Sequence, residues 1–295
     1  MSECRFLPQR IERVYTGPLP EDRGIEHRID QVAVEEPLEI QVARPEPTAV
    51  VATAAITMRT PGHDPELAVG FLIGEGIVRS LSDVLKVETR VPRPGVQIRV
   101  VLRAGCAFDL ERLRRNFDAT SSCGLCGKAS LQGLSMDAFA PLPQADPDAR
   151  IDAARVADLP RRLREAQEVF ERTGGLHAAG LFDAGGAPLV VREDVGRHNA
   201  VDKVIGACFL AGAWPLPGSI LAVSGRASFE LMQKAVASGI PMLAAVGAPS
   251  SLAVEVARRY GATLVGFTKA NGFNIYAGGE RIAVSAASPL VAALS

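Results

Sequence analysis

The pattern of hydrophobic and polar positions divides the chain into two regions. In the first, apolar segments at 31–42 and 49–58 have the composition of strands, and a helix is predicted to begin at Asp64. Asp64 can cap that helix, and Pro65 fits its first turn. Strands at 84–88 and 96–102 and a short basic helix at 109–116 follow. This order of elements predicts a small α+β domain.

The second region alternates regularly between helices and strands. A helix at 156–172 stops at Gly174-Gly175, and strands at 176–182 and 189–191 flank a hairpin turn at 183–186. Repeated βα units predict a mainly parallel sheet with helices on its faces. The predicted helices are 199–210, 228–237 and 252–260, and the predicted strands between them are 219–223, 242–246 and 263–267.

The fold class expected from this pattern is α/β, with a smaller N-terminal α+β domain. We place the small domain at 25–118, a cysteine loop and linker at 119–150, and the α/β domain at 151–295. Prolines and scattered charges before residue 25 predict a loose arm, and Pro141, Pro143 and Pro147 mark the linker.

Composition narrows the classes of function. With 295 residues, 47% of them hydrophobic, and a net charge of −1, the chain is expected to be globular and to have no nucleic-acid partner. No uncharged apolar run reaches the roughly 20 residues of a membrane span, and the N-terminus lacks the apolar segment of a signal peptide. Five cysteines do not resemble a secreted disulfide framework. We therefore expect a cytoplasmic protein without a membrane partner.

The stretch 120–128 carries the most distinctive chemistry. Cys123 and Cys126 stand three positions apart among glycines, and Lys128 can favour the reactive thiolate. Such a pair fits half of a zinc site, a dithiol redox pair, or a nucleophile that carries a sulfur atom. The stretch alone leaves these three alternatives open.

Two strand-to-helix junctions have the composition of an anion site. Ser224, Gly225 and Arg226 follow a strand and open a helix, and 248–251 repeats this arrangement without the arginine. Ligands of open α/β sheets bind beyond the carboxyl ends of strands, near helix N-termini. The alternative is ordinary N-capping by Ser228 and Ser250.

The segment 193–203 holds a third group of polar residues. Asp194, His198 and Asp202 could bind a nucleobase or guide a proton, and the alternative is a solvated helix start with one His198–Asp202 pair. His177 enters a strand among apolar neighbours, where a lone histidine is more often a core residue than a catalyst.

A fourth group is the stretch 267–274. Asn271-Gly272 predicts a tight hairpin turn, which accounts for these two residues without any ligand. Lys269, at the strand exit, would suit a phosphate or another anionic group.

Taken together and in order, these segments resemble the FdhD/NarQ family of formate dehydrogenase accessory sulfurtransferases. The matching stretches run from about residue 28 to Tyr276 and are 60–64, 66–72, 122–127, 175–179, 193–203, 224–226 and 248–253. The resemblance implies a cytidine-deaminase-like C-terminal domain. It also implies that a cysteine desulfurase loads sulfur as a persulfide, which then passes to the molybdenum cofactor (bis-molybdopterin guanine dinucleotide) of formate dehydrogenase.

The resemblance also implies the site residues and partners. Cys123 and Cys126 are the candidate catalytic residues, and a homodimer is expected, with the cysteine desulfurase and the formate dehydrogenase catalytic subunit as partners. The cofactor is the bound substrate, and GDP should mimic it. The family's cofactor-binding stretch maps onto Phe267, Thr268, Lys269, Ala270, Asn271 and Gly272. Relatives often carry arginine at the positions of Lys269 and Gly272, so one cation is missing here.

Guanine presents a pair of donors that a carboxylate can accept, and Asp194 and Asp202 are the candidates for reading the base. Ser224, Gly225, Arg226, His177 and His198 complete the predicted binding set.

Rival functions remain. A zinc deaminase needs His-x-Glu and Pro-Cys-x-x-Cys, but Ser122 replaces the proline and no histidine of the chain has glutamate two residues later. A thiol–disulfide oxidoreductase and a cofactor-binding chaperone without sulfur transfer stay open. We expect no bound zinc, because further ligands for the pair are not obvious beside Cys4, Cys106 and Cys208.

Overall fold

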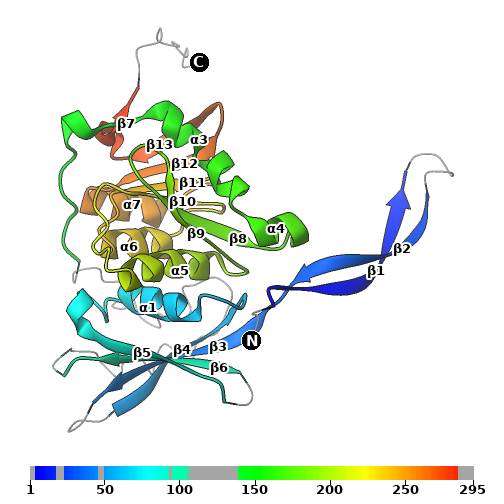
Figure 1. Cartoon of the computed structure of the whole chain (residues 1–295). Helices are drawn as coiled ribbons and strands as arrows, with labels where there is room; N and C mark the ends of the chain where they lie inside the picture. Colours follow the sequence, from blue (N-terminus) through cyan, green and yellow to red (C-terminus); the bar gives the residue numbers. More distant parts are fainter. Residues whose placement is uncertain are drawn as a thin grey trace.

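The computed structural model describes residues 4–17, 23–45, 50–92, 95–104, 106 and 139–284. A four-stranded sheet, a layer of helices, a six-stranded sheet and a second set of helices are stacked on one another, and a two-stranded ribbon projects from their side (Figure 1).

The four-stranded sheet is formed by the first region of the chain. Its strands are β3 (Glu36–Arg44), β4 (Val50–Arg59), β5 (Val84–Arg90) and β6 (Val96–Leu102), in the order β4-β3-β6-β5. Alternate residues of β3 and β6, such as Leu38, Ile40 and Ile98, are fully buried in the core that contains α1 (Asp64–Gly74). The predicted helix at Asp64 and the strands at 49–58, 84–88 and 96–102 are confirmed.

The six-stranded sheet is mixed, so the prediction of a mainly parallel sheet is wrong. Its order is β13-β12-β11-β10-β8-β9, and only the β10–β11 and β11–β12 pairs are parallel. The turns at 183–186 and 270–271 are too short for the crossover that parallel neighbours need, so they produce antiparallel pairs. The strands are β8 (His177–Phe182), β9 (Pro188–Asp194), β10 (Ile220–Val223), β11 (Met242–Ala245), β12 (Thr263–Lys269) and β13 (Gly272–Ala277).

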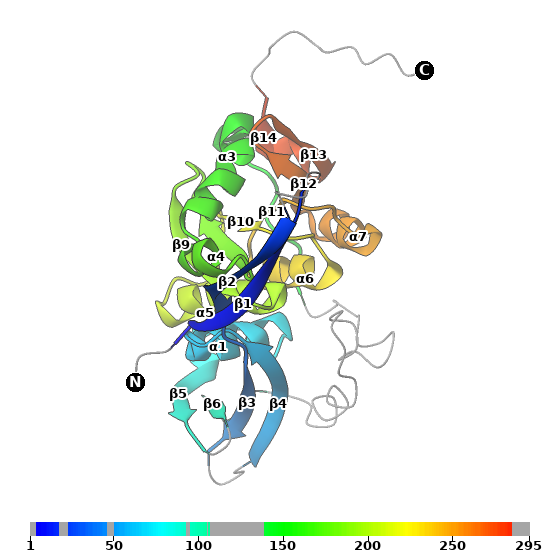
Figure 2. The same cartoon turned by 90° about the vertical axis from the view of Figure 1, so that its right-hand side faces the viewer.

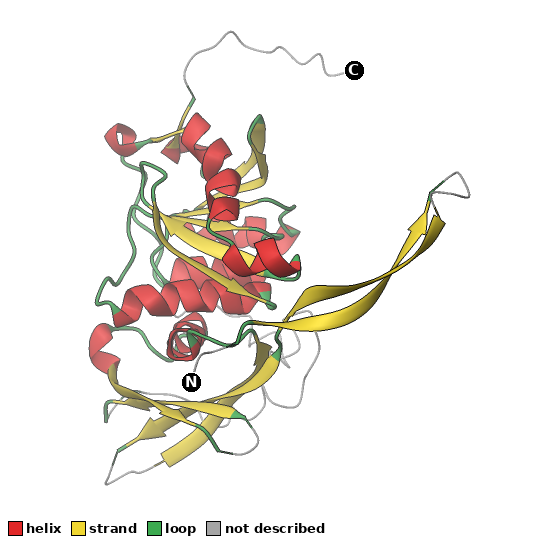
Figure 3. Ribbon diagram, turned by 45° about the vertical axis from the view of Figure 1, so that its right-hand side comes forward, coloured by secondary structure: helices red, strands yellow, loops and turns green. Residues whose placement is uncertain are grey.

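Helices cover both faces of this sheet (Figure 3). α5 (Arg197–Leu210), α6 (Phe229–Ala237) and α7 (Ser251–Tyr260) share one core with α1 and the four-stranded sheet. α3 (Ala153–Glu165) packs on the other face in a second core, and α4 (Glu168–Thr173) follows it. Short 3-10 turns, Leu81–Asp83, Pro147–Ala149 and Gly279–Arg281, and the pair β7 (Ile151–Asp152) and β14 (Ile282–Ala283) complete the described elements.

The helix predicted at 156–172 is broken into α3 and α4. The carboxylate of Glu193, on β9, accepts hydrogen bonds from the backbone N–H groups of Val169 (2.9 Å) and Phe170 (2.8 Å). It therefore caps a new helix N-terminus at α4. The cap comes from a residue more than 20 positions away, which a local pattern cannot predict.

The predicted loose arm is also wrong. β1 (Phe6–Thr16) and β2 (Arg23–Ala33) pair antiparallel over their whole length and form the projecting ribbon (Figures 1 and 2). Charged residues occur on both faces of this ribbon and hide the alternation that indicates a strand. Its base is held to the body, where the Arg172 guanidinium lies 5.1 Å from the centre of the Phe6 ring.

α1 and α5 cross with almost no side chain between them. A Cβ on Gly70 would lie 1.9 Å from the carbonyl oxygen of Asp202, and one on Gly206 would lie 1.8 Å from that of Glu66. Only glycine allows two helix backbones to approach this closely. Through this crossing the two regions share one core, and the domain division at 118 and 150 stays a prediction. No helix in the described ranges is long and apolar enough to span a membrane.

Candidate functional site

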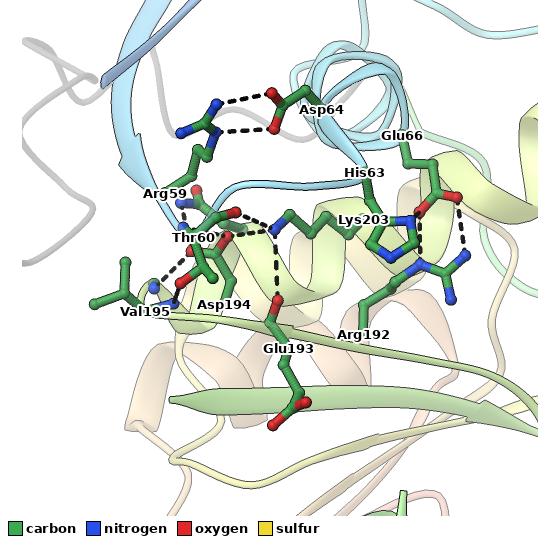
Figure 4. A network of polar contacts seen from close by, with 12 residues as sticks. Arg59, Thr60, His63, Asp64, Glu66, Arg192, Glu193, Asp194, Val195 and Lys203 are labelled. Carbon is green, nitrogen blue, oxygen red and sulfur yellow. Dashed lines mark hydrogen bonds and ion pairs between the residues drawn. The ribbon is translucent and has the colours of Figure 1, made fainter. Parts of the chain in front are cut away.

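A buried polar network joins the loop before α1 to the start of α5 (Figure 4). Arg59, which is 2% exposed, donates two hydrogen bonds of 2.8 Å to the Asp64 carboxylate and a third of 3.1 Å to Glu36. This bidentate pair fixes the chain between β4 and α1, so the following residues are presented to α5 in one conformation.

Asp194 lies at the centre of this network and is fully buried. One of its oxygens accepts from the N–H of Gly196 (2.8 Å) and the amide of Asn199 (3.0 Å). The other accepts from the N–H of Thr60 (3.2 Å) and faces the ammonium of Lys203 at 2.7 Å. A carboxylate has about four acceptor positions, and these contacts fill them. Lys203 also donates to the carbonyl of Thr60 at 2.8 Å.

This placement changes the reading of both predicted base-reading carboxylates. Asp194 has no acceptor position left for a ligand. Asp202 is 2% exposed and pairs with Lys234 at 2.6 Å. Burial raises the pKa of Asp202, and the Lys234 ammonium opposes that rise. The structure therefore favours a structural role for both residues: Asp194 joins the end of β9 to the loop before α1, and Asp202 joins α5 to α6.

A second ion pair joins α1 to β9. Arg192 donates to both oxygens of Glu66, at 2.6 and 2.8 Å, and His63 lies 3.4 Å from the same carboxylate. The far side of the His63 ring contacts Arg5 at 2.9 Å, which ties the ribbon's base to this pair. Burial raises the pKa of Glu66, but hydrogen bonds and charge from Arg192 and His63 outweigh it and lower that pKa to about 2.

The lowered pKa predicts acid sensitivity. A group whose folded pKa is depressed stabilises the fold above its unfolded pKa of 4.5, and this contribution is lost as the pH falls toward 2. Glu66→Gln should lower the free energy of unfolding at neutral pH by about 3 kcal/mol, and by much less at pH 3. Urea unfolding followed by circular dichroism at both pH values measures the difference. Glu165→Gln, on an exposed ion pair, is the control. An equal loss at both pH values would contradict the assignment.

The carboxyl ends of the parallel strands form one continuous edge. Ser224 and Ala178 exchange two hydrogen bonds, the N–H of Gly247 donates to Gly225 (2.9 Å), and the N–H of Phe267 donates to Gly247 (3.1 Å). At the other end His177 pairs with Asp194. This line of contacts, which we call the sheet edge, joins the ends of β9, β8, β10, β11 and β12. It brings together the predicted residues His177, Asp194, Ser224, Gly225 and Phe267.

The first turn of α5 packs over this edge. A Cβ on Gly225 would lie 3.6 Å from Nδ1 of His177 and 3.8 Å from Cδ of Arg197, so both side chains lie over that glycine. Burial and the nearby Arg197 and His198 lower the pKa of His177, and its ring is neutral at neutral pH. His177 is half-buried and lies beside Gly225 at the sheet edge.

His198 is held by the start of α6. Its Nε2 lies 3.2 Å from the hydroxyl of Ser228 and 3.7 Å from the carboxylate of Glu230. Burial raises the pKa of Glu230, but hydrogen bonds from His198 and Ser228 outweigh it and lower that pKa to about 2. The predicted His198–Asp202 pair is wrong, because Asp202 faces Lys234 instead. Capping by Ser250 is confirmed, with 3.2 Å from its hydroxyl to the N–H of Ala253, whereas Ser228 makes no such cap.

Two exposed cations flank the edge. Arg226 lies against Gly247, where a Cβ would be 3.0 Å from its Cγ, and Lys269 ends β12. The chain turns into β13 at Ala270 and Asn271, one residue earlier than the predicted Asn271-Gly272 turn, and Gly272 begins β13 opposite Lys269. Phe267 has a φ of 52° and a half-exposed ring, while the buried hydroxyl of Thr268 has no hydrogen-bond partner among the described residues. An unusual backbone and an unpaired polar atom are typical of ligand-binding segments.

Two residues of the edge were not predicted as site residues. Arg197 has a buried Nε that finds no hydrogen-bond partner in the described part of the chain, and it belongs to a polar segment that already suggested a site. Glu230 resembles an ordinary acidic residue in the first turn of a helix, and its contact with His198 spans 32 positions. Nothing local in the sequence indicates that contact.

Cys123 and Cys126 lie outside the described residues, so their predicted roles stay predictions. Two of the described cysteines are poor thiolates, because burial raises the pKa of Cys208, and burial and Asp83 raise that of Cys106. The third, exposed Cys4, donates to the carbonyl of Phe6 at the base of the ribbon. No group of three or more possible metal ligands occurs in the part of the chain that the structure describes.

Comparison with known proteins places this chain in a family. Residues 33–283 match the model of the FdhD/NarQ family. The chain is 47% identical to the sulfur carrier protein FdhD of Streptomyces coelicolor, over 90% of this chain and 94% of the relative. It is 51% identical to the protein of that name from Mycolicibacterium paratuberculosis, over 86% and 93%.

A solved structure shares the fold. A crystal structure described as a putative formate dehydrogenase accessory protein from Desulfotalea psychrophila superposes with a TM-score of 0.68 and 24% identity, covering 95% of this chain and all of that one. The family match spans most of the sequence and includes each of the stretches, from 60–64 to 248–253, on which the resemblance rests. The chain therefore belongs to the FdhD/NarQ family.

Proposed function

We propose that this protein carries sulfur for the maturation of formate dehydrogenase. It takes sulfur from a cysteine desulfurase onto Cys123 or Cys126 as a persulfide, and passes it to the bis-molybdopterin guanine dinucleotide cofactor of the formate dehydrogenase catalytic subunit. Relatives named as sulfur carriers, at 47 and 51% identity, support this role.

Sulfur loading can be written as a balanced exchange. A thiolate of Cys123 attacks the terminal sulfur of the desulfurase persulfide, the S–S bond breaks, and the desulfurase thiolate leaves. Cys126 can then attack the Cys123 sulfur. Oxidation of the two cysteines to a disulfide supplies two electrons, which reduce the outer sulfur, and that sulfur leaves as hydrosulfide. A thiol reductant must restore the pair before the next cycle.

The observation that carries the cofactor part of the proposal is the sheet edge. One line of loops presents the N-termini of α5 and α6, whose N-cap residues Gly196 and Ser228 make no side-chain cap in the described structure, together with exposed Arg226 and Lys269. Free N–H groups and cations bind phosphate. The neutral ring of His177 adds a hydrogen-bonding group without another charge. A diphosphate with a polar ring fits this set of groups.

Nucleotide binding provides the test. GDP should bind the protein and ATP should bind much more weakly, and Arg226→Ala should weaken GDP binding by about tenfold or more, because a charge-assisted contact is lost. Isothermal titration calorimetry measures both. Arg155→Ala is the matched control, because Arg155 contacts the turn at 183–186, at the opposite end of β8 from the edge. Equal affinity for GDP and ADP would count against a guanine site.

A further inference from the structure

Ser228 and Ser250 occupy the same position in two consecutive βα units, but their hydroxyl groups make different contacts. They are the N-cap residues of α6 and α7, with φ of −88° and −85°. Ser250 accepts a hydrogen bond from the N–H of Ala253 at 3.2 Å, as an N-cap serine usually does. Ser228 makes no such cap in the described structure, and its hydroxyl lies 3.2 Å from Nε2 of His198 on α5. The backbone is nearly the same at both serines, so the contact with His198 accounts for the difference.

Glu230 sets the direction of this hydrogen bond. It is 8% exposed, and within the described ranges its ion-pair partner is His198, whose Nε2 lies 3.7 Å from the carboxylate. Burial raises the pKa of Glu230, but hydrogen bonds from His198 and Ser228 lower it to about 2, so the carboxylate is ionised at neutral pH and can only accept. The Ser228 hydroxyl donates its single proton to Glu230, which leaves its oxygen to accept from His198. Nε2 of His198 must then carry an N–H.

The other ring nitrogen of His198 is thereby set as an acceptor. A neutral imidazole carries one proton, so Nδ1 has a lone pair when the proton is held on Nε2. Nδ1 makes no hydrogen bond with the described residues, and the His198 side chain is 22% exposed. His198 belongs to the first turn of α5, which packs over the sheet edge next to α6 (Figure 1). Nδ1 is therefore the nitrogen that His198 has left for a ligand at the edge.

We propose that Ser228 and Glu230 are positioning residues that hold the proton of His198 on Nε2, so that Nδ1 accepts a hydrogen bond from a ring amide N–H of the cofactor. This inference rests on the proposed binding of the cofactor at the sheet edge. Guanine carries such a group at N1, and a pterin carries one at N3. Adenine has an unprotonated nitrogen at N1, whose lone pair would face that of Nδ1 and leave both unpaired. His198 thus supplies a discrimination that Asp194 and Asp202 cannot, because their own partners occupy them.

The protonation of the two ring nitrogens can be measured without any ligand. Nitrogen-15 chemical shifts distinguish a protonated from an unprotonated imidazole nitrogen, and the chain has four histidines, so the His198 signals are assigned by their loss in His198→Gln. At pH 8 the unmodified protein should show a protonated Nε2 and an unprotonated Nδ1. Glu230→Gln and Ser228→Ala should each give a mixture of the two tautomers. A proton on Nδ1 in the unmodified protein, or an unchanged tautomer in both variants, would overturn the proposal.

Two probes then identify the ligand group. GDP and neopterin, a pterin without a nucleotide, are titrated separately, and the probe that donates to His198 should shift the Nδ1 signal. By calorimetry, Glu230→Gln and Ser228→Ala should each weaken that probe about fivefold or more and change ADP binding much less, because ADP has no donor for Nδ1. Glu255→Gln, at an exposed carboxylate on α7, is the matched control and should change neither. Circular dichroism confirms that each variant is folded.

The outcomes separate this inference from the proposed function. A shift with GDP assigns the guanine to His198, and a shift with neopterin assigns the pterin. Binding of either probe without a change at Nδ1, or equal losses of GDP and ADP affinity in the variants, would overturn the role given to His198 and leave the cofactor site standing. Failure of both probes to bind the unmodified protein would contradict the cofactor site itself, and with it this ligand.

Discussion

Alanine in place of Cys123 is expected to abolish activation of a formate dehydrogenase by this protein, because the variant has no thiolate to form the persulfide at that position. Glycines and small residues surround Cys123 in the sequence, so removal of the thiol should open no core cavity and the fold should persist. We expect Cys126→Ala to damage activation as well. The activity of the client enzyme, matured with each variant, measures the effect.

The control for this experiment is the same substitution elsewhere. Cys4→Ala removes an exposed thiol from the base of the ribbon, and it should leave activation unchanged. Full client activity with Cys123→Ala would contradict the assignment of this cysteine. Unfolding of Cys123→Ala, seen by circular dichroism, would contradict the expectation that the thiol has no structural role.

The second large effect concerns the crossing of α1 and α5. Alanine in place of glycine inside a helix usually stabilises it, by about 0.5–1 kcal/mol. At Gly206 the added methyl would lie 1.8 Å from the carbonyl oxygen of Glu66, so the two helices must separate. Gly206→Ala should therefore destabilise the protein by about 3 kcal/mol or more, since overpacking against a backbone has no flexible neighbour to absorb it.

Chemical unfolding measures the change in the free energy of unfolding. A decrease shows that the clash with Glu66 outweighs the gain in helix propensity, and an increase shows the reverse. Gly175→Ala is the control, because a Cβ there would meet its neighbours at an ordinary 3.7 Å. A Gly206→Ala variant as stable as the unmodified protein would show that the crossing is looser than the structure has it.

The strand and helix pattern predicted much of this fold because its signals are local. The βα units from 199 to 267 lie within a few residues of their predicted positions, and the hairpin turn predicted at Asn271-Gly272 forms one residue earlier, at Ala270 and Asn271. Those elements could be predicted because each has a continuous run of buried apolar residues or ends at a glycine. The direction of β8 could not be predicted in this way, because it is set by how the β8–β9 hairpin packs against β10 and not by a local pattern.

The polar face of α5 shows why the sequence alone suggested ligand contacts for these carboxylates. Asn199, Asp202 and Lys203 look like solvent-facing residues of an amphipathic helix, but all three are buried. Some of their partners are far away in the sequence, on β4, in the loop before α1 and on α6, and Asp194 at the end of β9 is the nearby one. The pattern of the motif could not distinguish a structural ion pair from a ligand contact. The ribbon was missed for a related reason, because charged residues stand on both of its faces.

Sulfur loading is the most direct test of the proposed function. The protein is incubated with a cysteine desulfurase and cysteine without reductant, and its intact mass and peptides are measured by mass spectrometry. The account predicts a gain of one sulfur atom on the peptide that contains Cys123 and Cys126, absent without the desulfurase and reversed by a thiol reductant. An unchanged mass, or sulfur found only on Cys4, Cys106 or Cys208, would contradict it and favour a chaperone that binds the cofactor without carrying sulfur.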